Sequence, residues 1–279
     1  MTISTDRITF ITDFLKREIG LALDESKLYL IRARLLPVIR QHGINSLDAL
    51  IDEVKKNERC EIAKQVVDRM TTNETLFFRD KYPFEALKNN LLSTLVSERP
   101  GFSRIKIWSA AASTGQEAYS IAMTALQTLD DAANKVSILG TDISSVAIAA
   151  AKEGVYKQME VRRGLAIQDL ANFFKQRDEH SWQVKDELKA MVKFQEANLI
   201  SPSLVTNIRH YSLFDIVFCR NVLIYFDLKQ RKQVIDHIAQ LTQVGGYLFT
   251  GAGEMVQGQR SVWETVRIEN RPVWRLVSK

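Results

Sequence analysis

Residues 107–123 read IWSAAASTGQEAYSIAM, an apolar strand end followed by a loop of small residues and then an amphipathic helix. A loop of this kind carries a dinucleotide when three glycines follow the spacing G-x-G-x-x-G. Only Gly115 lies in this loop, and Glu117 in the first turn of the helix would repel a phosphate. We therefore expect the loop to bind a ligand other than a dinucleotide.

Short apolar runs that end in small or polar residues recur after residue 100. They are RIKIWSA (104–110), KVSILGTD (135–142), FDIVFCRN (214–221) and GGYLFTGAGE (245–254), and helical patterns separate them. Buried parallel strands have this character, because both faces are covered and the alternation of polar and apolar residues disappears. The pattern predicts an α/β fold, a doubly wound and mostly parallel sheet with ligands at the carboxyl ends of its strands.

The remaining sequence predicts two further parts. Apolar residues at helical spacing in residues 1–70 indicate an all-helical N-terminal domain. Residues 71–90 are expected to link this domain to the sheet and to contribute to the active site. Residues 91–279 then form the second domain, and the strand–helix alternation stops at about 155–195, where we expect an inserted β-subdomain with a helix and a few antiparallel strands.

Composition excludes several classes of protein. With 46% hydrophobic and 25% charged residues, the chain resembles an ordinary soluble globular protein, and its net charge of +5 is too diffuse to indicate a nucleic-acid partner. No apolar run approaches the roughly 20 residues of a membrane-spanning helix, and the N-terminus lacks a signal-peptide core. Cys60 and Cys219 match no metal-ligand spacing, so we expect no metal site and a reducing, cytoplasmic location.

The predicted strand ends place candidate ligand-binding residues in one crevice. The loop 110–115 follows the first strand, Asp142 ends the second, and Arg220 and Asn221 end the run FDIVFCRN, which is expected to be the fourth strand of the fold. An acidic residue at the end of the second strand is placed to bind a ribose diol, while Glu117 could accept a hydrogen bond from an α-amino group. A cationic nucleoside without phosphate fits these residues, and the fold is then expected to be of the S-adenosylmethionine-dependent methyltransferase type.

Four motifs occur in order along the chain: TTNETLFFRD (71–80), WSAAASTGQEAYSIAM (108–123), LGTDIS (139–144) and FCRNVLIYFD (218–227). Together they resemble the chemotaxis receptor methyltransferases, the CheR family, and the likeness covers nearly the whole chain. The departures lie in the first loop, where the family commonly reads S-A-G-C-S-T-G-E-E-P-Y. This chain has Ala111, Ala112, Gln116 and Ala118 there, and it retains Glu117.

The resemblance implies that the chain transfers the methyl group of S-adenosylmethionine to glutamate side chains on the cytoplasmic helices of chemoreceptors, releasing S-adenosylhomocysteine. It assigns cofactor binding to Asn73, Thr75, Arg79, Ala111, Glu117, Asp142, Asn198, Leu199, Cys219, Arg220 and Asn221. Arg79 and Tyr225 are the expected catalytic residues, Arg79 to orient the acceptor carboxylate and Tyr225 beside the transferring methyl group.

This chemistry needs no general base. A glutamate side chain, with an ordinary pKa of about 4.3, is already ionised at neutral pH, so the enzyme has to align and desolvate it. None of the four histidines lies in a motif. Taken alone, Arg79 is equally explained as a solvated charge of the linker, Tyr225 as a core residue and Asn221 as a helix cap.

Alternative functions stay open at this point. The chain could methylate another acceptor, or act as a catalytically weak adaptor that only binds a partner. Methylation of nucleic-acid bases is disfavoured, because no Asn/Asp-Pro-Pro-aromatic motif follows the fourth strand and neither cysteine follows a proline. Nothing in the sequence demands more than a monomer.

Positive charge on the predicted second helix suggests where a receptor docks. Lys27, Arg32, Arg34 and Arg40 lie in a stretch without acidic residues between 26 and 47, and this surface should attract a glutamate-rich receptor helix. Some family members instead bind a C-terminal receptor pentapeptide through a longer, glycine-containing loop of the insertion. The corresponding stretch here, KQRDEHSW (175–182), is short and has no glycine, so we expect pentapeptide-independent docking.

Overall fold

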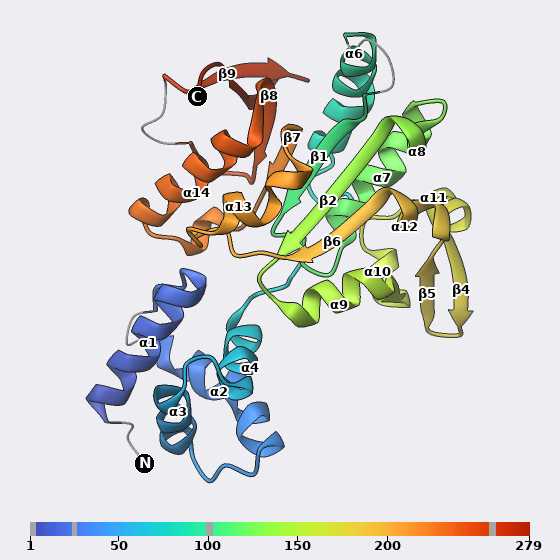
Figure 1. Cartoon of the computed structure of the whole chain (residues 1–279). Helices are drawn as coiled ribbons and strands as arrows, with labels where there is room; N and C mark the ends of the chain where they lie inside the picture. Colours follow the sequence, from blue (N-terminus) through green and yellow to red (C-terminus); the bar gives the residue numbers. More distant parts are fainter. Residues whose placement is uncertain (1–3, 24–26, 99–102, 257–260) are drawn as a thin grey trace. The chain divides into compact units, whose positions relative to one another are not determined.

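The computed structural model describes residues 4–23, 27–98, 103–256 and 261–279. The chain divides into two compact units, whose elements are labelled in Figure 1. The first unit comprises Met1–Thr72 and Ile224–Arg231, and the second comprises Asn73–Leu223 and Lys232–Lys279. Within the described ranges, no helix combines the length and the apolar character that crossing a membrane requires.

The first unit is built on four helices, which are α1 (Thr5–Ile19), α2 (Leu28–Gln41), α3 (Leu47–Lys56) and α4 (Glu61–Met70). Each helix buries one apolar stripe, such as Phe14 and Leu15 of α1 and Leu35 of α2, as the helical period predicts. Ser46 caps α3, because its Oγ accepts a hydrogen bond of 3.1 Å from the backbone N–H of Ala49.

A segment from the second half of the chain packs with these helices. It contains the end of η4 (Leu223–Tyr225) and the first turn of α14 (Leu228–Leu241). Lys16 forms an ion pair of 3.2 Å with Asp227, and Gly20 ends α1 with a φ of 72°. A side chain at position 20 would overlap the ring of Phe226, so both the backbone conformation and this close approach require glycine.

The second unit is built around a seven-stranded sheet with the order β6-β2-β1-β7-β8-β10-β9. Its strands are β1 (Ile105–Ala110), β2 (Val136–Asp142), β6 (Val192–Glu196), β7 (Phe214–Cys219), β8 (Thr242–Thr250), β9 (Trp263–Ile268) and β10 (Arg271–Leu276). The pairings from β6 through β8 are parallel, while β10 pairs antiparallel with both β8 and β9. This arrangement confirms the predicted mostly parallel α/β sheet.

Helices connect the strands and cover the sheet (Figure 1). They are α5 (Tyr82–Ala86), the π-helix η2 (Leu87–Leu91), α6 (Leu92–Ser97), α7 (Gln116–Thr128), α8 (Ala132–Lys135), α9 (Ser145–Glu153), α12 (Asp186–Met191), α13 (Leu204–Ile208), the 3-10 helix η3 (Arg209–Tyr211) and the rest of α14. The residues of α7 from Ala118 to Ala125 are all buried, which fixes the loop before this helix against the sheet.

A small antiparallel sheet with the order β3-β5-β4 interrupts the main fold. Its elements are β3 (Val155–Lys157), α10 (Gln158–Arg162), α11 (Ile167–Phe173), β4 (Phe174–Asp178) and β5 (Ser181–Val184). The stretch KQRDEHSW forms most of β4, a tight turn and the start of β5. Residues 192–196, at the end of the expected insertion, pair instead with β2 of the main sheet as strand β6.

Candidate active site

The small-residue loop after β1 has an unusual backbone. Ala111, Ser113 and Gly115 have φ values of 66°, 51° and 98°, and the first two of these lack the conformational freedom of glycine. Contacts with neighbouring segments hold the loop in place. The N–H of Ala112 donates to the carbonyl of Thr141 at 2.8 Å, which anchors the loop to β2.

Asp142, at the carboxyl end of β2, shapes this loop directly. One carboxylate oxygen accepts a hydrogen bond of 2.8 Å from the N–H of Ser113, and the other accepts one of 3.0 Å from the N–H of Ser144. The side chain is buried. A carboxylate offers about four acceptor positions, so Asp142 can still accept further hydrogen bonds from a ligand such as a ribose diol.

Glu117, in the first turn of α7, lies between two strand ends. Its carboxylate accepts a hydrogen bond of 2.7 Å from the Oγ of Ser109 at the end of β1. It also accepts one of 2.9 Å from Nη1 of Arg220, which follows β7. The Arg220 side chain is only 2% exposed and that of Glu117 only 12%, so this ion pair is shielded from water.

The segment 73–80 is joined to the same loop. The Oγ of Ser113 donates a hydrogen bond of 2.9 Å to the carbonyl of Asn73, and the N–H of Phe78 donates one of 3.0 Å to Ser120 of α7. Phe77 is fully buried, and its ring makes edge-to-face contacts with Tyr156 and with Phe174 of the insertion. The segment carrying Asn73, Thr75 and Arg79 is therefore ordered within the second unit.

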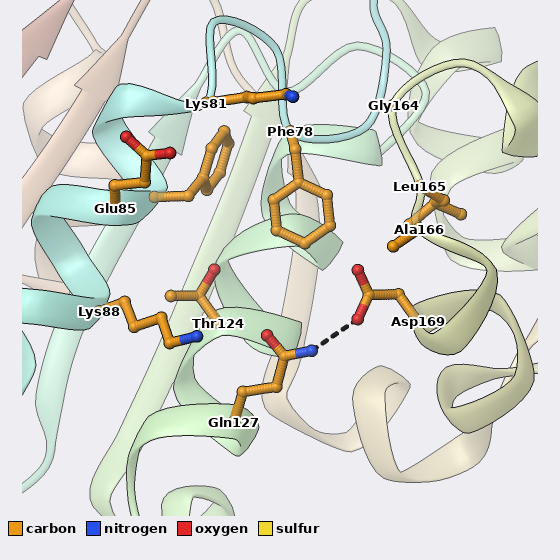
Figure 2. Close-up of a pocket in the computed structure, with 11 residues that line it drawn as sticks. Phe78, Lys81, Glu85, Lys88, Thr124, Gln127, Gly164, Leu165, Ala166 and Asp169 are labelled. Atoms are coloured by element: carbon orange, nitrogen blue, oxygen red, sulfur yellow. Dashed lines mark hydrogen bonds between the residues drawn. The ribbon is translucent and has the colours of Figure 1, made fainter.

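Gly164 lies against this segment from the side of the insertion. It has a φ of 100°, and a Cβ built at this position would overlap the carbonyl oxygen of Phe77. Glycine is therefore required both by the backbone conformation and by the close approach of the Phe77 backbone. Figure 2 shows Gly164 in the loop that borders the pocket next to Phe78.

This pocket has a volume of about 600 Å³ and lies beside the turn that follows Arg79. The ring of Phe78 points into the pocket and packs edge to face on the ring of Phe84, with 5.2 Å between the ring centroids. Gln127 and Asp169 also line the pocket, and Gln127 donates a hydrogen bond of 2.6 Å to Asp169 (Figure 2). None of the candidate cofactor-binding side chains lines it. The pocket and the candidate cofactor site are therefore two separate features.

Arg79 and Arg220 differ in their surroundings. Nη1 of Arg79 is 3.3 Å from the carbonyl of Glu74, and the side chain is partly exposed. Nη2 of Arg220 donates to the carbonyl of Arg79 at 2.8 Å and to the carboxylate of Asp80 at 2.6 Å. Arg220 thus contacts both Glu117, a candidate cofactor-binding acid, and the turn that carries Arg79.

The end of β7 carries two more candidate residues. The Cys219 side chain is fully buried and burial raises the pKa of its thiol, so Cys219 can reach a ligand only through its backbone. Asn221 has a φ of 57°, and its N–H donates a hydrogen bond of 2.8 Å to Glu254, which also accepts one of 2.7 Å from Gly251. Glu254 is buried and holds the two strand ends of β7 and β8 together.

Asn198 and Leu199 follow β6 at the same edge of the sheet. The N–H of Ala197, just before them, donates a hydrogen bond of 2.9 Å to the carbonyl of Asp142. Nδ1 of His237, on α14, lies 2.9 Å from the carbonyl of Leu199. The candidate adenine-side residues are therefore fixed both to β2 and to α14.

The remaining candidates belong to the helical unit. Tyr225 lies in the segment that packs with α1 and is grouped with that unit. Lys27, Arg32 and Arg40 are exposed on or beside α2. Arg34 differs, because it donates hydrogen bonds to the carbonyl of Met70 at 2.8 Å and to Thr72 at 3.1 Å, and so caps the end of α4.

The charges at the carboxyl ends of β1, β2 and β7 favour a cationic ligand. Glu117 and Asp142 are both negative, and Arg220 shares its single positive charge between Glu117 and Asp80. Residues 111–116 contain no lysine or arginine, and Glu117 stands where a phosphate would meet the N-terminus of α7. Among the described residues, no group of three His, Cys, Asp or Glu side chains is arranged to hold a metal ion.

Sequence reasoning overlooks four of these residues: Ser109, Asp80, Glu254 and His237. Ser109 lies near the end of β1 and Glu254 shortly after the end of β8, and the sequence predicts both strands. Their position at the carboxyl edge of the sheet could therefore have identified them as candidate site residues. Asp80 directly follows Arg79 and ends the motif TTNETLFFRD. For His237, the helical pattern of its surroundings offers no such signal, because its partner lies 38 residues away in the chain.

Comparisons with known proteins cover nearly the whole chain. Residues 6–71 match the family model described as "CheR methyltransferase, all-alpha domain", and residues 73–271 match "CheR methyltransferase, SAM binding domain". A chemotaxis protein methyltransferase of Vibrio parahaemolyticus is 39% identical, over 99% of this chain and 98% of that protein. Chemotaxis protein methyltransferase Cher2 of Pseudomonas putida is 38% identical, over 91% of this chain and 92% of that protein.

Proposed function

We propose that this chain, which belongs to the CheR methyltransferase family, transfers the methyl group of S-adenosylmethionine to glutamate side chains on the cytoplasmic helices of chemoreceptors. The products are glutamyl methyl esters and S-adenosylhomocysteine. The relatives in Vibrio parahaemolyticus and Pseudomonas putida are named as chemotaxis protein methyltransferases, which supports a role in chemotaxis. The proposed substrate places the reaction in the cytoplasm, and we propose that the enzyme acts as a monomer.

The observation that carries this proposal is the pair of acidic side chains beside the small-residue loop. Asp142 orders the loop through the N–H of Ser113, and Glu117 stands at the helix end that would otherwise favour a phosphate. Two carboxylates at this edge, with no cation in the loop between them, suit a ligand that is positively charged and carries no phosphate.

When bound, S-adenosylmethionine supplies a methyl group activated by the positive charge of its sulfonium. Asp142 would accept hydrogen bonds from the ribose hydroxyls, and Glu117 would accept one from the α-amino group. The other residues proposed to contact the cofactor are Asn73, Thr75, Arg79, Ala111, Asn198, Leu199, Cys219, Arg220 and Asn221. Because the Cys219 side chain is buried and the Arg220 side chain is held by Glu117, these two are expected to act through backbone groups or through their neighbours.

The acceptor glutamate needs orientation and desolvation, and it needs no base, since its carboxylate is ionised at neutral pH. Arg79 is partly exposed and held at 3.3 Å from the carbonyl of Glu74, so its guanidinium is available to bind a carboxylate through two hydrogen bonds. Holding the carboxylate oxygen in line with the methyl group would lower the barrier by positioning. We propose Tyr225 as the second catalytic residue, beside the transferring methyl.

Docking of the receptor is proposed to rest on α2. Lys27, Arg32 and Arg40 are exposed, and a glutamate-rich coiled coil has the complementary charge. Arg34 contributes less, because its hydrogen bonds to Met70 and Thr72 commit it to the end of α4. A receptor pentapeptide is not required in this proposal, since β4 and β5 are joined by a short connection without glycine.

The proposal is tested by methyl transfer from tritium-labelled S-adenosylmethionine to a soluble coiled-coil fragment carrying the methylation region of a chemoreceptor. We expect label on the fragment that is released as methanol by mild base, which identifies a carboxyl methyl ester. A fragment with its glutamates changed to alanine is the control and should take up no label. Binding of the cofactor by calorimetry without any transfer would instead support the adaptor.

The pentapeptide question needs a separate measurement. Receptor fragments with and without the C-terminal pentapeptide should be methylated at the same rate, and the free pentapeptide should not bind in calorimetry. Micromolar binding, or a rate that depends on the tail, would contradict this part of the proposal and leave the methyltransferase activity standing.

A further inference from the structure

The turn around Arg79, residues 78–81, has a backbone conformation that its residues do not favour by themselves. Phe78, Asp80 and Lys81 have φ values of 49°, 65° and 49°, and none of them is glycine. Left-handed conformations of such residues persist where surrounding contacts hold them. The turn directly follows the segment proposed to contact the cofactor and contains the arginine proposed to orient the acceptor.

Arg220 supplies contacts that hold this turn. Its Nη2 donates to the carbonyl of Arg79 at 2.8 Å and to the carboxylate of Asp80 at 2.6 Å, while its Nη1 donates to Glu117 at 2.9 Å. The guanidinium is planar, so these three acceptors fix one another's positions. Because the Arg220 side chain is only 2% exposed, these bonds are poorly replaced by water.

Asp80 is the member of this group whose removal acts most selectively on the turn. The hydrogen bond of Glu117 with Ser109 and its pair with Nη1 of Arg220 do not involve Asp80. The Asp80 side chain is 46% exposed, so it contributes little to the core. Its carboxylate nonetheless offsets part of the charge of the buried Arg220. Because Arg220 also pairs with Glu117, this interaction holds the turn close to Glu117.

We infer that Asp80 is a positioning residue for methyl transfer: through Arg220 it holds the turn that presents Arg79 to the acceptor carboxylate. This inference rests on the proposed function. Arg220 also connects the two binding sites of the proposed reaction. Its guanidinium contacts Glu117, which is proposed to bind the cofactor, and the backbone of Arg79, which is proposed to bind the acceptor. A shift of about 1 Å in Arg79 is enough to slow an aligned transfer severely.

Contacts that do not involve Asp80 are expected to hold the turn against α5 and α7 when Asp80 is changed. The N–H of Phe78 donates to Ser120, and the Phe78 ring meets Phe84 at 5.2 Å in the pocket shown in Figure 2. Asp80→Asn preserves the size of the side chain, removes its charge and replaces one acceptor oxygen by a donor NH2 group. The variant is therefore expected to fold, with the turn less tightly held to Arg220.

The test compares Asp80→Asn with Glu85→Gln in the full chain. Glu85 is an exposed acid on α5 that lines the pocket, and it has no ion pair among the described residues. Each variant is assayed by labelled methyl transfer to the receptor fragment and by calorimetry with S-adenosylhomocysteine. We expect Asp80→Asn to lower kcat by about tenfold or more, with cofactor affinity within about twofold of wild type, and Glu85→Gln to match wild type.

A second arm asks whether Asp80 acts through Arg79. In an Arg79→Ala background, Asp80→Asn should cause little further loss of kcat, since the residue that the turn positions is already gone. Full additivity of the two losses would overturn the inference, as would an unchanged kcat or an Asp80→Asn variant that does not fold. If wild type itself forms no methyl ester, the proposed function has failed instead.

Discussion

Ser113 and Asn73 are joined by a hydrogen bond of 2.9 Å from the Oγ of one to the backbone carbonyl of the other, across 40 residues of chain. The same Ser113 donates its N–H to Asp142 at 2.8 Å. Three segments that are proposed to meet one cofactor are thus connected to each other through the protein alone. Such preorganisation lowers the cost of ordering these segments when a ligand binds.

Changing Asp142 should therefore affect cofactor affinity in two ways. Asp142→Ala removes an acceptor for the ribose and also frees the N–H groups of Ser113 and Ser144. We expect affinity for S-adenosylmethionine and S-adenosylhomocysteine to fall together, by about 1–3 kcal/mol, because both ligands share the ribose. Calorimetry measures both values, and Asp130→Ala, at an exposed position after α7, is the control. Unchanged affinity would remove Asp142 from the site.

Arg79→Ala should damage turnover more than folding. Within the described part of the chain, the Arg79 side chain makes one hydrogen bond, of 3.3 Å to the carbonyl of Glu74, so we expect little stability to depend on it. The initial rate of methyl transfer is expected to fall by about a hundredfold, as the acceptor loses its orienting group. Thermal unfolding of the ligand-free protein should shift by no more than a degree or two. Full activity in this variant would refute the orienting role, and an unfolded protein would indicate a structural one.

Two arginines of α2 should respond differently to charge reversal. Arg40→Glu alters an exposed charge, so receptor methylation should slow and become less sensitive to salt, with cofactor affinity unchanged. Arg34→Glu removes the hydrogen bonds to Met70 and Thr72 and should lower the stability of the helical unit by about 1–2 kcal/mol.

Methylation rates at two salt concentrations, together with thermal unfolding, separate these effects. If Arg40→Glu leaves the KM for the receptor fragment unchanged, α2 does not contribute to docking through this residue. If the Arg34→Glu variant has the same melting temperature as the wild-type protein, the hydrogen bonds of Arg34 to the end of α4 contribute no measurable stability.

The two cysteines should differ in their reactivity. Burial raises the pKa of the Cys219 thiol well above its ordinary value, so Cys219 stays protonated and inaccessible in the folded protein. Cys60, at the start of α4, is partly exposed. Iodoacetamide at mildly alkaline pH should modify Cys60 first, and Cys219 only after denaturant is added. Peptide mass spectrometry reads both sites, and equal labelling of the native protein would contradict the burial of Cys219.

The central strands could be predicted because their physical environment simplifies the sequence. β1, β2 and β7 are covered on both faces, so they read as continuous apolar runs that end at Ala110, Asp142 and Cys219. The strands toward the two ends of the sheet lack this signal. β9 and β10 mix charged with apolar residues, and the VKFQE run of β6 resembles a surface strand, which is why residues 192–196 are predicted to lie in or near the insertion.

The sequence predicts individual residues of the candidate site, and it does not predict the contacts between them. Asp142 follows from its place at the end of a strand and Glu117 from its place in the first turn of the next helix, while the other contacts follow from the family resemblance. What one sequence does not contain is the pairing of side chains distant in the chain. Arg220 is predicted from the family resemblance to contact the cofactor, but the sequence does not predict that its guanidinium pairs with Glu117, 103 residues away, and with Asp80, 140 residues away.

The contact between Gly164 and the carbonyl of Phe77 has a consequence for anyone who builds chimaeras from this protein. The small sheet of the insertion resembles an exchangeable cassette, since its three strands pair with one another and with no other described strand. Its connection at position 164, however, lies directly on the backbone that leads to Arg79. A graft taken from a relative with any larger residue at this position would push on the segment proposed to orient the acceptor, so we expect that the splice has to retain this glycine for the recipient to stay active.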